Sequence, residues 1–311
     1  MRGGRLVSGA AVLICATLLV CRLSVAQQSQ AQDIASSISR ADAGDAVAEK
    51  QLLHFLLHAD PAAQGFDPAM VWLRSRAERD EPQAEFTLGY LYEHGRGVTK
   101  DYAQAATSYQ AAALHDDHSA QNNLAFLYQR GLGVPRDPQR AYELYLAAAQ
   151  QNDISALCNL ATMYYTGSGV PRDDTQAARW FRAAAQLGDT AAQHDLAVFY
   201  AEGIGMSANL KDAARWEELA ARQGYRMAEA GLGMLYQAGK GVPLDYVSAY
   251  AWYARAAEDG DNLSGLRMKS LAKIMTAKQI DQARRYIASL SRSGSKAEQA
   301  KVSEGTSRGE E

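Results

Sequence analysis

Histidine and aspartate side chains that could ligate a metal stand close together at two places. Residues 115–118 read His-Asp-Asp-His, and His54 and His58 are spaced one helical turn apart. The first cluster falls where a turn is expected and has no copy elsewhere in the repeat described below. The second has no evident third ligand. The sequence therefore favours polar surface at both places, and we predict no metal site and no cofactor.

The nucleophilic side chains do not form a catalytic set. Cys15 and Cys21 lie in an N-terminal apolar segment, which leaves Cys158 without a partner for an internal disulfide. An inert thiol is the simplest interpretation, with intermolecular pairing or redox sensing left open. The sequence shows no nucleophile elbow, no paired catalytic carboxylates and no Ser/His/Asp set. We therefore predict that the protein is not an enzyme and has no catalytic residues.

The segment Gly95-Arg96-Gly97 suggests a third chemistry, because glycine-rich loops can hold phosphates on their backbone N–H groups. It returns four times, each time 36 residues later, and always lacks the third glycine of a nucleotide-binding loop. This repetition favours a structural turn with positive φ at the glycines. The turn glycines are Gly95, Gly97, Gly131, Gly133, Gly167, Gly169, Gly203, Gly205, Gly239 and Gly241.

The turns separate two helices in every repeat. Ala84 and Leu88 begin columns of identical residues at 36-residue spacing, and the period of three to four between columns is that of a buried helix face. Position 89 is always Gly or Ala, which would let the second helix approach closely. Asp101 and its equivalents are suited to cap the second helix. Asp101 and Gln104 also have the spacing of a capping box.

The pattern Ala-x3-Leu-Gly-x2-Tyr-x2-Gly-x-Gly-Val-x2-Asp-x3-Ala-x6-Ala-Ala resembles the Sel-one-like repeat (SLR), a relative of the tetratricopeptide repeat. The resemblance implies an all-α fold, a right-handed α/α solenoid (superhelix) of 36-residue helix-turn-helix repeats. Five repeats occupy 83–262. A degenerate repeat at 46–82 is expected to cap the N-terminal end. Capping helices at 263–290 are expected to close the other end, with Thr276 as the N-cap of the last helix.

The N-terminal end of the chain predicts export, and both ends of the mature chain are polar. Arg2 and Arg5 precede a short apolar run that ends in small residues at Ala26, so we interpret 1–26 as a signal peptide. Retention as a membrane anchor and lipidation are left open. Polar composition predicts a flexible leader at 27–45 and a disordered tail at 291–311. The expected location is the periplasm of a Gram-negative cell, otherwise secreted or membrane-anchored.

A partner surface is expected on the side of each first helix that lies opposite Ala84. This side comprises positions 83, 86, 87, 90 and 94 and their 36-residue equivalents. The resemblance implies that it lines a concave groove. Exposed aromatic rings resemble binding hot spots, and amides can hydrogen-bond an extended backbone. The expected partner-binding residues are Phe86, Tyr90, Asn122, Asn123, Phe126, Arg130, Asn159, His194 and Asp195.

The sequence therefore favours a non-catalytic exported scaffold that binds a protein or peptide along this concave face. The resemblance extends its expected roles to envelope signalling, assembly or host interaction. A net charge of −3 argues against nucleic acid as the partner. Two alternatives stay open. One is a peptidoglycan- or β-lactam-directed enzyme of the cysteine-rich repeat type, although this chain lacks the cysteine pairs of those relatives. The other is a purely structural envelope spacer.

Overall fold

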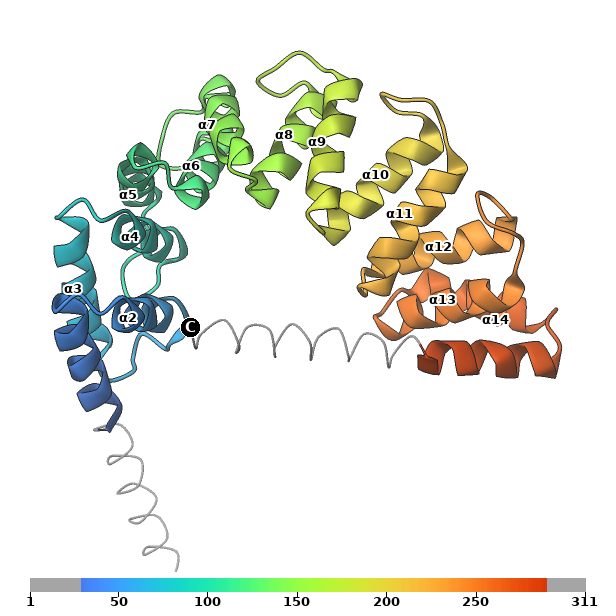
Figure 1. Ribbon diagram of the computed structural model, residues 1–311, viewed down its shortest axis with the longest axis horizontal. Helices are drawn as coiled ribbons and strands as arrows, with labels where there is room; N and C mark the ends of the chain where they lie inside the picture. Colours follow the sequence, from blue (N-terminus) through green and yellow to red (C-terminus); the bar gives the residue numbers. More distant parts are fainter. Residues whose placement is uncertain (1–28, 290–311) are drawn as a thin grey trace, which may run out of the picture. The chain divides into compact units, whose positions relative to one another are not determined.

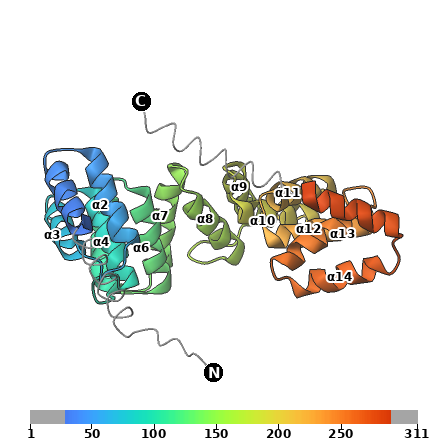
Figure 2. The same ribbon diagram turned by 90° about the horizontal axis from the view of Figure 1, so that it is seen from below.

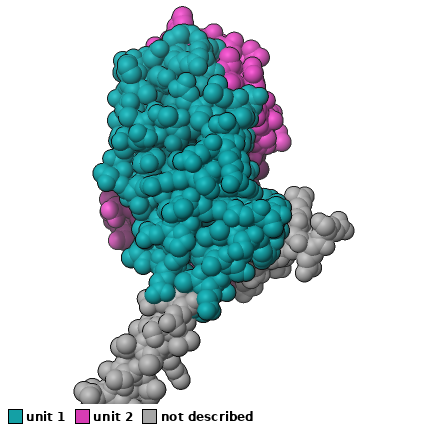
Figure 3. Space-filling view, turned by 90° about the vertical axis from the view of Figure 1, so that its left-hand side faces the viewer, with its two compact units in different colours: residues 1–144 teal, residues 145–311 magenta. Residues whose placement is uncertain are grey.

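The computed structural model describes residues 29–289, and every regular element within them is an α-helix (Figure 1). The chain divides into two compact units, coloured separately in Figure 3, which we call unit 1 (1–144) and unit 2 (145–311). The boundary falls inside helix α7 (Pro138–Gln150). The expected signal peptide at 1–26 and the expected tail at 291–311 lie outside the described residues.

Each repeat is a pair of helices, as the 36-residue period predicts (Figures 1 and 2). The first helices are α4 (Pro82–His94), α6 (His118–Arg130), α8 (Ile154–Thr166), α10 (Thr190–Glu202) and α12 (Arg226–Ala238). The second helices are α5 (Tyr102–Leu114), α7, α9 (Asp174–Gln186), α11 (Leu210–Arg222) and α13 (Tyr246–Glu258). The helices α2 (Ala46–His58) and α3 (Phe66–Ala77) precede these pairs, and α14 (Asn262–Ala272) follows them. The predicted all-α fold, an α/α solenoid of 36-residue repeats, is confirmed.

The two helices of a pair pack closely because position 89 of the repeat is small. A Cβ atom on Gly89 would lie 2.7 Å from Cδ1 of Tyr109, which is buried on α5. Gly233 and Tyr253 repeat this arrangement in the last pair, again at 2.7 Å. Such a distance is shorter than van der Waals contact, so glycine lets the ring lie directly on the backbone of the first helix. The predicted close approach of the helices is therefore confirmed.

The glycine turns have the conformation that the sequence predicts. All ten glycines have positive φ, and Gly95, the C-cap of α4, donates its N–H to the carbonyl of Leu91. The second glycine of a turn also contacts the preceding repeat. A Cβ atom on Gly133 would overlap the backbone of Tyr102, and one on Gly241 would overlap the carbonyl of Leu210. Close approach, in addition to positive φ, thus requires glycine here.

The N-cap residue of a second helix is hydrogen-bonded through both its side chain and its backbone N–H. The Asp101 carboxylate accepts hydrogen bonds from the N–H groups of Ala103 and Gln104, which confirms the predicted cap. The N–H of Asp101 donates to the carbonyl of Tyr92 at 2.9 Å, and an equivalent bond recurs in the other four repeats. This bond corrects the expectation of a capping box, because the N–H that the Gln104 side chain would bind already has a partner.

We expect Asp101→Ala to lower the free energy of unfolding by about 1 kcal/mol, because two N–H groups lose their acceptor. Asp101→Asn should be nearly neutral, since Asn209 caps α11 in the same way, through the N–H groups of Lys211 and Asp212. Urea denaturation followed by far-UV circular dichroism measures both changes. Equal losses for the two variants would contradict the assigned role of the side-chain oxygen.

The N-terminal end is more ordered than its composition predicts. Residues 29–42 form a helix, and Ile34 and Ile38 pack on the core that α2 and α3 share. The expected flexible leader at 27–45 is therefore wrong for its described part. The prediction relied on the polar composition and gave no weight to these two isoleucines, which stand one helical turn apart. Their tertiary contacts stabilise a segment that would be marginal as an isolated helix.

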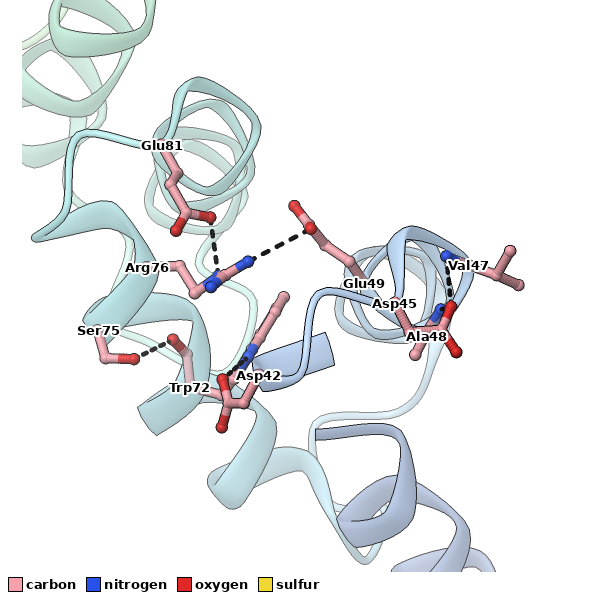
Figure 4. A network of polar contacts seen from close by, with 9 residues as sticks. All are labelled: Asp42, Asp45, Val47, Ala48, Glu49, Trp72, Ser75, Arg76 and Glu81. Carbon is pink, nitrogen blue, oxygen red and sulfur yellow. Dashed lines mark hydrogen bonds and ion pairs between the residues drawn. The ribbon is translucent and has the colours of Figure 1, made fainter. Parts of the chain in front are cut away.

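Polar contacts join these N-terminal helices (Figure 4). The Trp72 indole N–H donates to Oδ1 of Asp42 at 3.1 Å and connects α3 to the helix at 29–42. Arg76 on α3 forms ion pairs with Glu49 on α2 at 3.4 Å and with Glu81, the N-cap of α4, at 2.8 Å. One guanidinium therefore connects α2 and α3 to the start of the first glycine-turn repeat.

The C-terminal end is closed by α14 and by a last helix at 277–289. Thr276 caps this helix, as predicted: its hydroxyl oxygen accepts from the N–H of Gln279 at 3.3 Å, and Oε1 of Gln279 accepts from the N–H of Thr276 at 2.9 Å. This reciprocal pair is a capping box. None of the helices within 29–289 has the length and apolar character needed to cross a membrane.

Candidate functional site

The residues predicted to bind a partner all lie on first helices, and each unit carries some of them. In unit 1 they are Phe86 and Tyr90 on α4 and Asn122, Asn123, Phe126 and Arg130 on α6. In unit 2 they are Asn159 on α8 and His194 and Asp195 on α10. Each unit therefore has its own candidate site.

The candidate site of unit 1 is an aromatic patch, which we define as Phe86, Tyr90, Phe126 and Arg130. Phe126 is 37% exposed, and the Arg130 guanidinium carbon lies 5.7 Å from the centre of its ring. Tyr90 is half-buried and stacks on His94, with ring centroids 4.0 Å apart. Phe86 is also half-buried. The patch thus combines accessible aromatic surface with a cation held over one of the rings.

Contacts behind the patch fix the side chains that support it. The Phe86 ring lies 5.8 Å from that of Tyr109, whose hydroxyl donates to Oε2 of Glu93 at 2.6 Å. The Asn122 amide donates to Oδ1 of Asn123 at 3.1 Å. Burial, and then the hydrogen bond to Glu93, raises the pKa of Tyr109 despite an opposing hydrogen bond from Asn123. The phenol therefore stays protonated and keeps donating to the carboxylate.

Position 87, which the sequence placed on the partner side, is buried in the first repeat. Thr87 is 2% exposed, and its hydroxyl donates to the carbonyl of Gln83 at 2.7 Å. Thr87 follows Ala84 by three positions, and residues at this spacing are neighbours on a helix surface. Position 87 therefore lies at the edge of the packed side. The partner side is therefore corrected in the first repeat only, because the equivalent residues Asn123, Asn159 and Asp195 are half-buried. We call the side that carries positions 83, 86, 90 and 94, with these three residues at its edge, the first-helix face.

The candidate site of unit 2 is built around an ion pair between α10 and α11. Nδ1 of His194 lies 3.1 and 3.0 Å from the two carboxylate oxygens of Glu217. The side chains of His194 and Glu217 are 17% and 8% exposed. The ring of Tyr225, the N-cap of α12, lies 5.6 Å from the imidazole. We call His194, Asp195, Glu217 and Tyr225 the His194 cluster.

Sequence reasoning missed Glu217, although the repeat carries a signal for it. The equivalent position is aromatic in the other repeats, as Tyr109, Tyr145, Phe181 and Tyr253. Glu217 replaces this ring, and Gly231 on α12 leaves room for its carboxylate, because a Cβ atom on Gly231 would overlap Oε1. Other repeats carry Thr, Asn or Asp where Gly231 stands. The glutamate at 217 and the glycine at 231 both depart from the repeat pattern, and together they place a carboxylate in a buried position.

Burial governs protonation in the His194 cluster. Burial raises the pKa of Glu217 and of Asp195, and the charge of His194 offsets this only in part. Burial disfavours the charged form of His194, but the hydrogen bond and ion pair with Glu217 outweigh it and raise the pKa of the imidazole. Among the described residues, no lysine or arginine contributes to either carboxylate's shift. The fully ionised cluster therefore carries excess negative charge.

Cys158 on α8 is half-buried and free of any disulfide. Burial, followed by the charges of Asp189, Asp195 and Asp153, raises the pKa of its thiol to about 12. Because the thiolate is the nucleophilic form, a thiol that stays protonated at neutral pH reacts slowly. The geometry thus favours the interpretation of Cys158 as an inert thiol.

The histidine motifs serve local structure. In residues 115–118, Asp117 is the N-cap of α6 and accepts from the N–H of Ala120 at 2.7 Å. The rings of His54 and His58 lie 4.3 Å apart on α2. Over the described range 29–289, no three His, Cys, Asp or Glu side chains are grouped so that they could hold a metal.

Comparison with known proteins finds one family model, the Sel1 repeat, at residues 82–117, 118–153, 154–189, 190–225 and 226–261. These five segments together make up more than half of the 311-residue chain and begin one residue before the predicted boundary. No curated protein matches the chain.

Solved structures similar to this chain include two repeat proteins. One is a protective antigen present in uropathogenic Escherichia coli strains that displays an SLR fold, with 29% identity, a TM-score of 0.72, and coverage of 85% of this chain and 56% of that one. This chain therefore spans little more than half of the antigen's length. The other is a Sel1 repeat protein from Oxalobacter formigenes, with 27% identity, a TM-score of 0.61, and coverage of 75% of this chain and 97% of that one.

Proposed function

Since this chain belongs to the Sel1 repeat family, we propose that it is a non-catalytic scaffold that binds a protein or peptide through the aromatic patch of unit 1. Sel1 repeats generally mediate protein–protein interactions, and the proteins that contain them are typically non-catalytic scaffolds.

The observation that carries the proposal is the exposed pair of Phe126 and Arg130. Aromatic and arginine side chains dominate binding energy at interfaces because they bury much area and, for arginine, several donors. Tyr90 occupies the equivalent position of the preceding first helix, α4, where it stacks on His94. Tyr109, which is held by Glu93, supports the Phe86 ring from behind, so Phe86 loses little side-chain freedom when a partner binds.

Photo-crosslinking in the producing cell tests this surface. A crosslinking amino acid at position 90 or 126, followed by mass spectrometry, is expected to give one dominant protein adduct. The same label at Gln110, exposed on the second helix α5, should not give it. An adduct that is equally abundant from all three positions would place the interface elsewhere and favour a structural spacer.

Phe126→Asp is expected to weaken binding of that partner by at least about 30-fold, the effect of losing one hot-spot residue. Its circular dichroism and melting temperature should match wild type, because Phe126 lies on the first-helix face. Isothermal titration with the identified partner measures the loss, and Gln110→Asp is the matched control. Unfolding of Phe126→Asp would instead assign the ring to the core.

We also propose that the protein acts outside the cytoplasm. Support comes from the N-terminal sequence, where two arginines, an apolar run and Ala26 have the order of a signal peptide. Fractionation of the producing cell and N-terminal sequencing are expected to find a mature chain that begins at Gln27. A cytoplasmic chain that retains Met1 would overturn export and leave the binding proposal intact.

A further inference from the structure

The first helices near the end of unit 2 expose four large apolar side chains. Met227 and Met234 on α12 are 51% and 43% exposed, and Leu263 and Leu266 on α14 are 55% and 62% exposed. They stand at the repeat positions numbered 83, 86 and 90 in the first repeat, which belong to the first-helix face. We call these four residues the apolar strip.

The apolar strip continues the surface that carries the His194 cluster. Position 86 of the repeat is His194 in α10, Ala230 in α12 and Leu266 in α14. The ring contact of 5.6 Å between His194 and Tyr225 brings the cluster to the start of α12, and Met227 follows Tyr225 by two residues. The cluster and the strip therefore occupy equivalent positions on the first helices α10, α12 and α14, and α11 and α13 pack against successive members of this set.

Charge is distributed unevenly over this face. Asp195 and the buried Glu217 make its α10 end acidic. The nearby basic side chains are directed elsewhere: Arg226 donates to the carbonyl of Asp259 at 3.0 Å, and the Arg267 guanidinium carbon lies 5.8 Å from the centre of the Tyr253 ring. Arg267 follows Leu266 on α14, so a second cation is disfavoured at that end.

We infer that this face binds a protein segment in which a basic side chain is followed by large apolar side chains. The inference rests on the proposed function only in taking protein segments as the class of partner. The basic group would lie beside Asp195 and Glu217, where it offsets negative charge that no lysine or arginine within residues 29–289 offsets. Methionine surfaces adapt to varied apolar side chains, so the strip would tolerate several residue types.

The repeat spacing sets the pattern of such a segment. Packed helices lie roughly 10 Å apart, and an extended chain advances about 3.4 Å per residue. A segment that crosses α10, α12 and α14 in extended form would therefore carry apolar residues about three and about six positions after the basic residue. This pattern distinguishes the face from the aromatic patch of unit 1, which offers a cation of its own.

Selection from a phage-displayed library of random 12-residue peptides on the full-length protein tests the inference. Enriched peptides are expected to share a lysine or arginine followed by apolar residues at the stated spacing. With one enriched peptide, fluorescence anisotropy should show binding about 10-fold weaker for Asp195→Asn, as expected for one charge pair, and weaker still for Met234→Asp. Asparagine is tolerated at this position in Asn123 and Asn159.

Leu244→Asp is the matched control, because Leu244 is 58% exposed but lies outside the helices. It should bind the peptide as wild type does, and so should Phe126→Asp, which separates this face from the proposed one. Higher salt should weaken wild type more than Asp195→Asn. Enriched peptides without a basic residue, equal affinity of Asp195→Asn, or a homodimer that Met234→Asp dissociates would each overturn the inference.

Discussion

Replacement of Gly241 by alanine is expected to destabilise the protein by roughly 3–5 kcal/mol, because positive φ and overpacking act together there. Gly241 has φ +74°, and an added Cβ atom would overlap the carbonyl oxygen of Leu210, the first residue of α11. The turn can relieve this overlap only by moving away from the preceding repeat.

Gly224→Ala is the control for this prediction. Gly224 has a similar φ of +83°, but a Cβ atom there would meet nothing within 4 Å. Its replacement should cost only the strain of the left-handed conformation, about 1–2 kcal/mol. Chemical denaturation measures both losses, and hydrogen exchange should show reduced protection in α11 and α12 for Gly241→Ala alone. Similar losses for the two variants would refute a role for close packing at the turn.

Glu229→Gln is expected to abolish a large part of the pH dependence of stability. Glu229 on α12 is fully buried, and its Oε1 lies 3.1 Å from Nε of Arg255. Burial raises the pKa of Glu229 from 4.5 to about 7, although Arg255 opposes the shift. Glutamine is a compatible replacement, because Gln121 and Gln193 occupy the equivalent buried position in two other repeats.

The direction of this effect follows from proton linkage. Because the folded state holds the Glu229 proton more tightly, the stabilising contribution is fully present below pH 4.5 and is lost as pH rises to about 7. A shift of this size corresponds to a loss of about 3 kcal/mol. The two proteins should therefore have similar stability at pH 4, and Glu229→Gln should be more stable than wild type at pH 8.

Denaturation curves at several pH values measure this difference directly. Glu85, Asp195, Glu217 and His194 also have raised pKa values, so they add the same trend to both proteins and cancel in the comparison. Glu218→Gln serves as control, because its ion pair with Arg222 lies on the surface and contributes at most about 1 kcal/mol. Parallel pH profiles for wild type and Glu229→Gln would contradict the prediction.

The features that could be predicted from the sequence depend on local backbone geometry. A glycine with positive φ, such as Gly95, needs only its own neighbours in the chain. The same holds for an aspartate that accepts from the N–H groups two and three residues on, such as Asp101. These residue types, with asparagine once in place of aspartate, recur at the same position in all five repeats, which distinguishes them from the residues that vary between repeats. For the same reason the helix pairs, the turns and the cap at Thr276 agree with expectation.

The features that were missed depend on contacts between helices. The capping box at Asp101 fails because Tyr92 of the preceding helix supplies the competing carbonyl. The order at 29–42 depends on where Ile34 and Ile38 dock. The His194 side chain is only 17% exposed, and its partner Glu217 lies on another helix at a position that is otherwise aromatic. A deviation from the repeat was the available signal for that site.

At their second glycine, internal repeats meet main-chain atoms of the preceding repeat, which bears on how such proteins can evolve in length. Where Gly133, Gly205 and Gly241 meet the preceding repeat, they face the backbone of Tyr102, Asp174 and Leu210, three residues with unrelated side chains. At this turn, a duplicated or transplanted repeat would thus meet a backbone surface that does not depend on the side chains of these three residues. Gly97 differs, because it faces the ring of Phe66. The turn contact is therefore transferable between internal repeats, whereas the N-terminal pair uses a side-chain contact of its own.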